Sequence, residues 1–96
     1  MLADALKLKL VLVEDHDILR GMLKQALEEA GHSVVALSCA EELDDVAGGE
    51  FADVFLVDLS LPGEDGLSLA ARIRAAHPLV GLVMVTARSS LQDRLD

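Results

Sequence analysis

Three short apolar runs, each followed directly by a polar residue, constrain this chain more than any other feature of its sequence. The runs are Leu8–Val13, Val54–Val57 and Leu82–Val85, and the residues directly after them are Glu14 with Asp15, Asp58, and Thr86. Runs this short, bounded by polar residues, are typical of strands buried on both faces. In an open parallel sheet the carboxyl ends of the strands gather at one edge, where such folds bind their ligands. The pattern therefore predicts three carboxylates and a hydroxyl at one edge of a sheet.

Amphipathic segments between the apolar runs predict helices that alternate with the strands. We expect strands at 8–13, 33–37, 52–58 and 79–86, helices at 17–30, 39–47 and 67–77, and the start of another helix at Ser89. Asp17 is predicted to cap the first helix and Gly31 to end it in a left-handed conformation. The predicted inward faces are Leu19, Leu23, Ala26, Leu27 and Ala30 in the first helix, and Leu67, Ala70, Ile73 and Ala76 in the third. This alternation predicts one α/β domain with a parallel sheet and right-handed crossovers.

Charge and cysteine content exclude several classes of protein. The chain has 96 residues with 17 acidic and 8 basic side chains, a net charge of −9, and its basic residues form no run. A nucleic-acid-binding face needs clustered Lys and Arg, so we expect no direct nucleic acid contact. Cys39 is the only cysteine, which excludes an intramolecular disulfide. No secretory signal or membrane-length apolar stretch is evident, so a cytoplasmic location without membrane contact is expected.

The polar residues at the strand ends suit phosphoryl chemistry. Glu14, Asp15 and Asp58 offer oxygen ligands to an octahedral Mg²⁺ that keeps several waters. Asp58 is the candidate nucleophile, because a carboxylate oxygen attacks a phosphoryl group once a metal neutralises the incoming charge. The Thr86 hydroxyl could reach a phosphoryl oxygen. The alternative, that these acids are only loop and cap residues, does not explain why they share one edge.

Three motifs resemble the receiver domain of two-component response regulators: Val13–His16, Leu56–Leu67 and Val83–Ala87. The resemblance extends from about Leu8 and implies a flavodoxin-like, doubly wound parallel sheet of order 2-1-3-4-5. It implies phosphorylation of Asp58 by a sensor histidine kinase or a phosphotransfer protein, with Mg²⁺ as cofactor. By position, Asp15 would bind the metal directly, Glu14 through water, Asp58 through its carboxylate and Ser60 through its main-chain carbonyl. Thr86 would be the switch hydroxyl, and Ser60 and Arg88 occupy positions that tune the lifetime of the acyl phosphate.

The chain departs from the family pattern after Thr86. Family members continue through a fifth strand that carries a phosphate-binding lysine and then a last helix, whereas no lysine follows Lys24 here. We therefore expect residues 1–96 to be a C-terminally incomplete receiver domain that lacks strand five and the last helix. The strand at 79–86 would then be an unprotected edge, so self-association of this fragment is expected.

Two other functions stay open at this point. A Mg²⁺-dependent phosphatase with an aspartyl nucleophile would carry a second Asp two residues after the nucleophile as acid and base, but that residue is Ser60. A receiver-like module that works through protein contacts without phosphorylation is the other possibility. The intact Glu14, Asp15, Asp58 and Thr86 argue against it, and the missing lysine argues for it. The leading expectation is a phosphoacceptor regulatory domain, not an enzyme.

Overall fold

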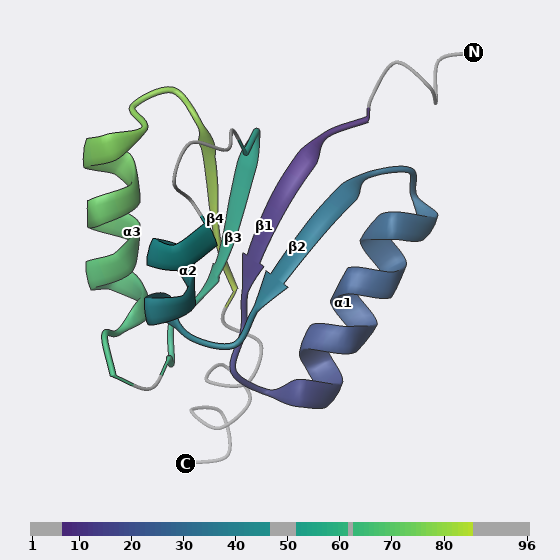
Figure 1. Cartoon of the computed structure of the whole chain (residues 1–96), viewed down its shortest axis with the longest axis horizontal. Coiled ribbons are helices and arrows are strands. Elements are labelled where there is room, and N and C mark those ends of the chain that lie inside the picture. The colour runs from purple at the N-terminus through teal and green to yellow at the C-terminus, as the bar shows by residue number, and fades with distance from the viewer. Residues whose placement is uncertain (1–6, 47–51, 62, 86–96) are drawn as a thin grey trace.

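The computed structural model describes residues 7–46, 52–61 and 63–85, which form a four-stranded sheet with helices on both faces (Figure 1). The elements are β1 Lys9–Val13, α1 Asp17–Glu29, β2 Ser33–Leu37, α2 Ala40–Val46, β3 Val54–Asp58, α3 Gly66–Ala76 and β4 Gly81–Val85. Every strand pair is parallel and the order is β2-β1-β3-β4. The predicted α/β class and the order 2-1-3-4 are confirmed. The described residues contain neither a fifth strand nor a helix after β4.

Successive side chains along β1 and β3 point to opposite faces of the sheet. Leu10 and Leu12 face α1 and form one core cluster with Val34, against which Leu23 and Leu27 of α1 pack. The opposite face lies under α2 and α3, and its cluster consists of Val13, Leu37, Ala40, Leu43, Phe55, Val57, Leu61, Leu69 and Ile73. Full burial of each large aliphatic side chain stabilises the fold by about 1.5–3 kcal/mol. The alternation thus fixes which way each strand faces.

The N-cap of the first helix lies one residue earlier than the sequence predicted. His16, not Asp17, is the N-cap: its backbone is extended and its Nδ1 accepts a hydrogen bond from the Leu19 N–H at 3.3 Å. Asp17 is instead the first helical residue, and its carboxylate pairs with Arg20 at 2.6 Å. The predicted end is confirmed, because Gly31 has φ of 104°.

The predicted inward face of α1 is only partly correct. Leu19, Leu23 and Leu27 are half-buried, but Ala26 and Ala30 are exposed. The helix is rotated so that Arg20, rather than Ala26, lies on its half-buried side. The rotation brings the Arg20 guanidinium within reach of the loop that precedes the helix.

The predicted inward face of α3 is only partly correct, since Ala70 and Ile73 are buried as expected but Leu67 and Ala76 are not. Leu67 is 67% exposed and Ala76 is also exposed, whereas Leu69 is fully buried together with Ala70 and Ile73. The apolar residues of α3 occur on more than one side of the helix, so its sequence pattern is compatible with more than one rotation about the helix axis. The rotation is fixed at its start, where the Asp65 carboxylate accepts a hydrogen bond from the Ser68 N–H at 2.8 Å.

The fourth strand begins two residues later than predicted and is less buried. It begins at Gly81, because Arg74 donates hydrogen bonds to the carbonyls of Pro78 and Val80, both at 2.8 Å, and holds this segment in a turn. Val83 is 47% exposed. Within the described residues β4 is the end strand of the sheet and pairs only with β3. None of the helices described is long and apolar enough to cross a membrane.

Candidate functional site

The acidic residues predicted to converge lie together at the carboxyl edge of the sheet, the lower edge in Figure 1. Glu14 and Asp15 directly follow β1, and Asp58 is the last residue of β3. Because β1 and β3 are neighbours with Val13 paired to Val57, the next positions along both strands are adjacent. One carboxylate oxygen from each of the three acids lies within 4.8 Å of the others. We call these three residues the acidic group.

Two members of the acidic group are almost completely buried. Glu14 is 1% exposed and Asp58 is 3% exposed, while Asp15 is half-buried. A buried carboxylate is costly unless hydrogen bonds or opposite charges compensate it. The His16 N–H donates to Glu14 Oε2, and the Ser60 N–H donates to Asp58 Oδ1, both at 3.0 Å. Each buried carboxylate is therefore held by the main chain of the loop that follows it.

The sheet's hydrogen bonding continues into these loops and orders them. The Glu14 N–H donates to the Leu37 carbonyl at 3.0 Å, and the Leu59 N–H donates to the Val85 carbonyl at 3.1 Å. Each bond ties a site loop to the end of the neighbouring strand. Glu14 and the residue after Asp58 are consequently anchored to the ends of neighbouring strands.

Gly66 allows the start of α3 to pack directly on the loop that carries Asp58. Its N–H donates to the Leu59 carbonyl at 3.2 Å. A Cβ at this position would lie 2.2 Å from the Asp58 carbonyl oxygen and 2.6 Å from the Leu59 Cα. Both contacts are with backbone, so no side-chain movement would relieve them. Sequence reasoning placed Gly66 in a loop and missed this close approach, which only the backbone geometry reveals.

Arg20 is the second residue near the site that sequence reasoning missed. Its Nη1 donates to the Glu14 carbonyl at 2.9 Å and to the Asp15 carbonyl at 3.4 Å. Its Nη2 pairs with Asp17 Oδ1 at 2.6 Å. The signal that could have found it is an arginine in the first turns of a helix that directly follows an acidic pair.

The acidic group fits a hard divalent cation. Three like charges this close repel one another unless a cation compensates them. Carboxylate oxygens are the ligands that Mg²⁺ and Ca²⁺ prefer. Ser60 adjoins the group through its N–H, and the role predicted for its carbonyl stays a prediction. Thr86 and Arg88 lie outside the described residues.

Two glutamates outside the acidic group have lowered pKa values. Hydrogen bonds from the Arg72 guanidinium, at 2.8 and 3.0 Å, hold the pKa of Glu64 below its usual range. The Ser38 N–H and hydroxyl donate to Glu42 Oε1 and lower the pKa of that carboxyl at the start of α2. Both interactions order loops at the edge of the sheet that carries the acidic group.

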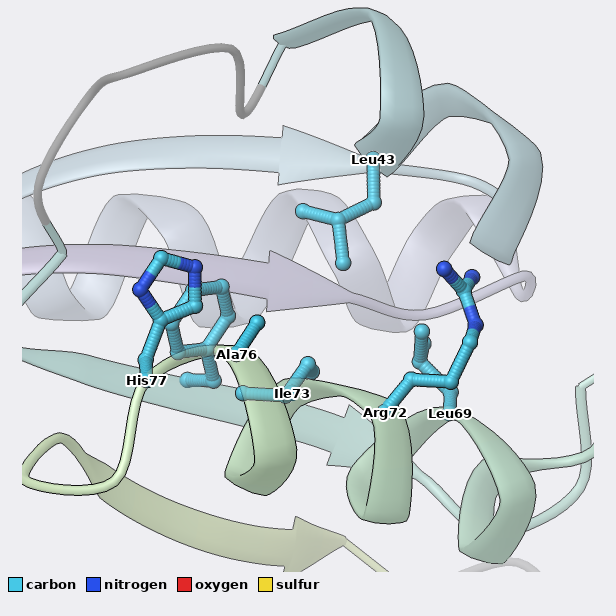
Figure 2. Close-up of a pocket in the computed structure, with 7 residues that line it drawn as sticks. Leu43, Leu69, Arg72, Ile73, Ala76 and His77 are labelled. Atoms are coloured by element: carbon cyan, nitrogen blue, oxygen red, sulfur yellow. The ribbon is translucent and has the colours of Figure 1, made fainter.

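A separate hollow of about 140 Å³ lies between α2 and α3 (Figure 2). Figure 2 shows Leu43 of α2 facing Ile73 and Ala76 of α3, with Arg72 and His77 towards opposite ends. The rings of Phe55 and His77 are stacked with centroids 5.9 Å apart. The described lining residues contain no carboxylate or hydroxyl, so the hollow lacks the groups that metal-assisted phosphoryl chemistry requires.

Known proteins with similar sequences are related to this chain. The response regulator receiver domain family matches residues 10–96. The chain is 38% identical over 89 residues to the virulence transcriptional regulatory protein PhoP of Salmonella typhimurium and to the transcriptional regulatory protein PhoP of Escherichia coli K12. These alignments cover 93% of this chain but 40% of each relative. The chain thus spans well under half the length of these regulators.

Solved structures share the fold described above. The response regulator TrrA from Thermotoga maritima, in complex with Mg²⁺ and BeF, superposes with a TM-score of 0.78 at 26% identity, covering 91% of this chain and 76% of that one. The non-phosphorylated HemR receiver domain from Leptospira biflexa gives a TM-score of 0.79 at 29% identity, with coverages of 93% and 72%. A Burkholderia pseudomallei response regulator with a phosphorylated aspartic acid and a calcium ion gives 0.76 at 28% identity, with coverages of 83% and 47%.

Proposed function

We propose that this chain, which belongs to the response regulator receiver domain family, takes a phosphoryl group onto Asp58 in a two-component signalling system. The observation that carries the proposal is the acidic group, in which a buried Asp58 lies within 4.8 Å of Glu14 and Asp15 at the carboxyl edge of the sheet. Asp58 is also oriented, because the Ser60 N–H holds its Oδ1. A phosphorylated aspartate in the Burkholderia relative supports the same chemistry here.

The transfer is a displacement at phosphorus. An Asp58 carboxylate oxygen forms the new bond to phosphorus while the bond to the donor's leaving group breaks, and the leaving group departs with the electron pair. Glu14, Asp15, Asp58 and the Ser60 carbonyl would hold Mg²⁺, with Glu14 acting through water. When bound, this ion supplies the positive charge that offsets the incoming phosphoryl oxygens. The chain's own contribution is to bury and orient the carboxylate that attacks.

We infer that residues close to Asp58 respond to its phosphorylation and control how long the acyl phosphate lasts. Thr86 would act as the switch hydroxyl, and Ser60 and Arg88 would tune the lifetime of the acyl phosphate. Any contribution of the domain to the hydrolysis of its own acyl phosphate is part of this regulatory role. The phosphoryl donor would be a sensor histidine kinase or a phosphotransfer protein in the cytoplasm. The acidic charge of the chain favours neither nucleic acid nor anionic membrane contact.

The alternatives are less well supported. An aspartyl phosphatase would need an acid and base two residues after the nucleophile, and Ser60 cannot replace a carboxyl group in that role. A module without phosphorylation would have no use for a buried carboxylate group, which opposes folding when no cation compensates it.

Phosphorylation is tested on the natural protein with acetyl phosphate and Mg²⁺, read by intact mass. We expect the addition of one phosphoryl group, no adduct in Asp58→Asn, and a normal adduct in the matched control Asp65→Asn, where the new side chain still caps α3. An adduct that persists in Asp58→Asn, or that vanishes equally in the control, would contradict the assignment. A polypeptide of these 96 residues alone should form little stable adduct, because no lysine after Lys24 can hold the phosphoryl oxygens.

We further propose that this 96-residue polypeptide self-associates through β4. Within the described residues β4 is an end strand, its span Gly81–Val85 contains neither charge nor proline, and Val83 is 47% exposed. Such an edge is a template for pairing with another chain. Light scattering over a dilution series should show an apparent mass above that of a monomer. A monomer at high micromolar concentration would refute the proposal.

A further inference from the structure

We propose that Arg20 is a positioning residue for the acidic group: it holds the backbone of Glu14 and Asp15 so that both carboxylates face Asp58. The inference rests on the proposed function, because it assumes that this group binds Mg²⁺. Arg20 lies in the first turns of α1, with its side chain 22% exposed. Its guanidinium reaches back along the chain rather than outwards, and it contacts three oxygens of the preceding loop and helix start.

The segment that Arg20 holds is short. Glu14 leaves β1 with its N–H bonded to the Leu37 carbonyl, and His16 already caps α1. Asp15 is the single residue between them, so its direction depends on how the peptide units on both sides are set. Arg20 Nη1 bonds the carbonyl on each side of that residue, at 2.9 and 3.4 Å. The contact therefore fixes the part of the loop that aims the Asp15 carboxylate.

The planar fork of arginine is suited to this task. Nη2 is anchored on Asp17 Oδ1 at 2.6 Å while Nη1 bonds the two carbonyls, so the guanidinium cannot rotate without breaking one of these contacts. Lysine carries the same charge on one nitrogen and cannot reproduce this planar geometry. A role in positioning thus requires arginine itself, whereas a role in charge balance requires only a cation.

A charge-balance role makes the opposite prediction for metal binding. A guanidinium bonded to the backbone of Glu14 and Asp15 would offset part of the negative charge of the acidic group, so removing it would increase the attraction of the site for a cation. Under that role Arg20→Gln tightens Mg²⁺ binding and Arg20→Lys leaves it unchanged. If Arg20 acts by positioning, both substitutions weaken binding. Residues that orient metal ligands typically change metal affinity by about 10–100-fold when they are replaced.

The test is calorimetric titration of the natural protein with MgCl₂. We expect the Mg²⁺ affinity to fall about tenfold or more in both Arg20→Gln and Arg20→Lys. The matched control is Lys24→Gln, which removes the same charge one turn further along α1, where Lys24 pairs with Glu28 at 2.7 Å. This control should stay within about twofold of the wild type, because its partner is a surface glutamate. Circular dichroism establishes that each variant is folded at the temperature of the titration.

The outcomes separate the inference from the proposed function. Wild-type affinity in folded Arg20→Lys, or tighter binding in Arg20→Gln, overturns the positioning role while leaving the Mg²⁺ site intact. A wild-type protein that binds no Mg²⁺ overturns both. If Arg20→Gln fails to fold, Arg20→Lys decides alone, since it keeps the charge and loses only the fork. An equal loss of affinity in Lys24→Gln would also refute the inference, because a substitution at a surface ion pair of α1 would then weaken Mg²⁺ binding as much as one at Arg20 does.

Discussion

The backbone contact at the start of α3 determines whether Gly66→Ala raises or lowers the free energy of unfolding. Intrinsic helix preference alone predicts that Gly66→Ala stabilises the protein by about 0.5–1 kcal/mol. In the structure, however, the new Cβ would lie 2.2 Å from the Asp58 carbonyl oxygen. Carbon atoms of this kind essentially never approach closer than 3.0 Å, so the two segments must separate by at least 0.8 Å. The clash and the preference therefore predict opposite results.

The size of the effect follows from the contacts that are lost. Forcing an extra methyl group into a packed site costs about 1–3 kcal/mol. The separation also weakens the bond from the Gly66 N–H to the Leu59 carbonyl, which contributes about 0.5–1.5 kcal/mol. After subtraction of the helix preference, the free energy of unfolding should fall by roughly 1–3.5 kcal/mol. Asp58 carries the displaced carbonyl, so phosphorylation from acetyl phosphate should slow by about tenfold or more.

Native-state hydrogen exchange is the assay, because peptides from β1 and β3 report the unfolding of this domain alone. The predicted loss corresponds to roughly 5- to 400-fold faster exchange in those peptides. The matched control is Gly21→Ala in α1, where a Cβ has no neighbour within 4 Å and should stabilise by about 0.5–1 kcal/mol. If Gly66→Ala stabilised the protein as Gly21→Ala does, the close packing of α3 on the Asp58 loop would be wrong.

Three further predictions test the packing, capping and charge described above. Leu69→Ala should lower the free energy of unfolding by about 2–5 kcal/mol, because Leu69 is fully buried, while Leu67→Ala should change it by less than about 0.5 kcal/mol; equal effects would mean that α3 is rotated as the sequence pattern suggested. Asp65→Ala should cost about 1 kcal/mol through loss of the cap, and a urea midpoint equal to that of the wild type would argue against the cap. The lowered pKa of Glu64, caused by Arg72, contributes stability that is present above the ordinary glutamate pKa and lost as pH falls through the lowered value. Thermal unfolding should therefore show a smaller loss of stability on acidification in Glu64→Gln than in the wild type, and identical acid profiles would contradict the interaction.

The strands could be predicted because short apolar runs have few alternatives in a chain of this size. Leu10, Leu12, Val13 and Val57 are buried as their runs require, and the polar residues after β1 and β3 converge because parallel strands end at one edge. The resemblance to receiver domains added the sheet order, which the family match and the solved structures bear out.

The details that were mispredicted depend on forces that a one-dimensional pattern does not contain. His16 caps α1 although histidine is not among the usual capping residues, because Asp17 is engaged by Arg20. Leu69 faces the core in place of Leu67, because the turn at Asp65 and Gly66 sets the rotation of α3 before its apolar residues are placed. Side-chain interactions at the start of each helix accompany both of these outcomes.

The order of the strands also determines when this site can exist during folding. Glu14 and Asp58 are separated by 44 positions in sequence, and they meet only after β1 has paired with β3, past the intervening β2. A shift of that pairing by one residue would turn Asp58 to the other face and put Val57 or Leu59 in its place. Partly folded chains with local structure alone therefore cannot form the acidic group. Any ion bound there draws its affinity from the correctly registered sheet, so it selects that register over its competitors.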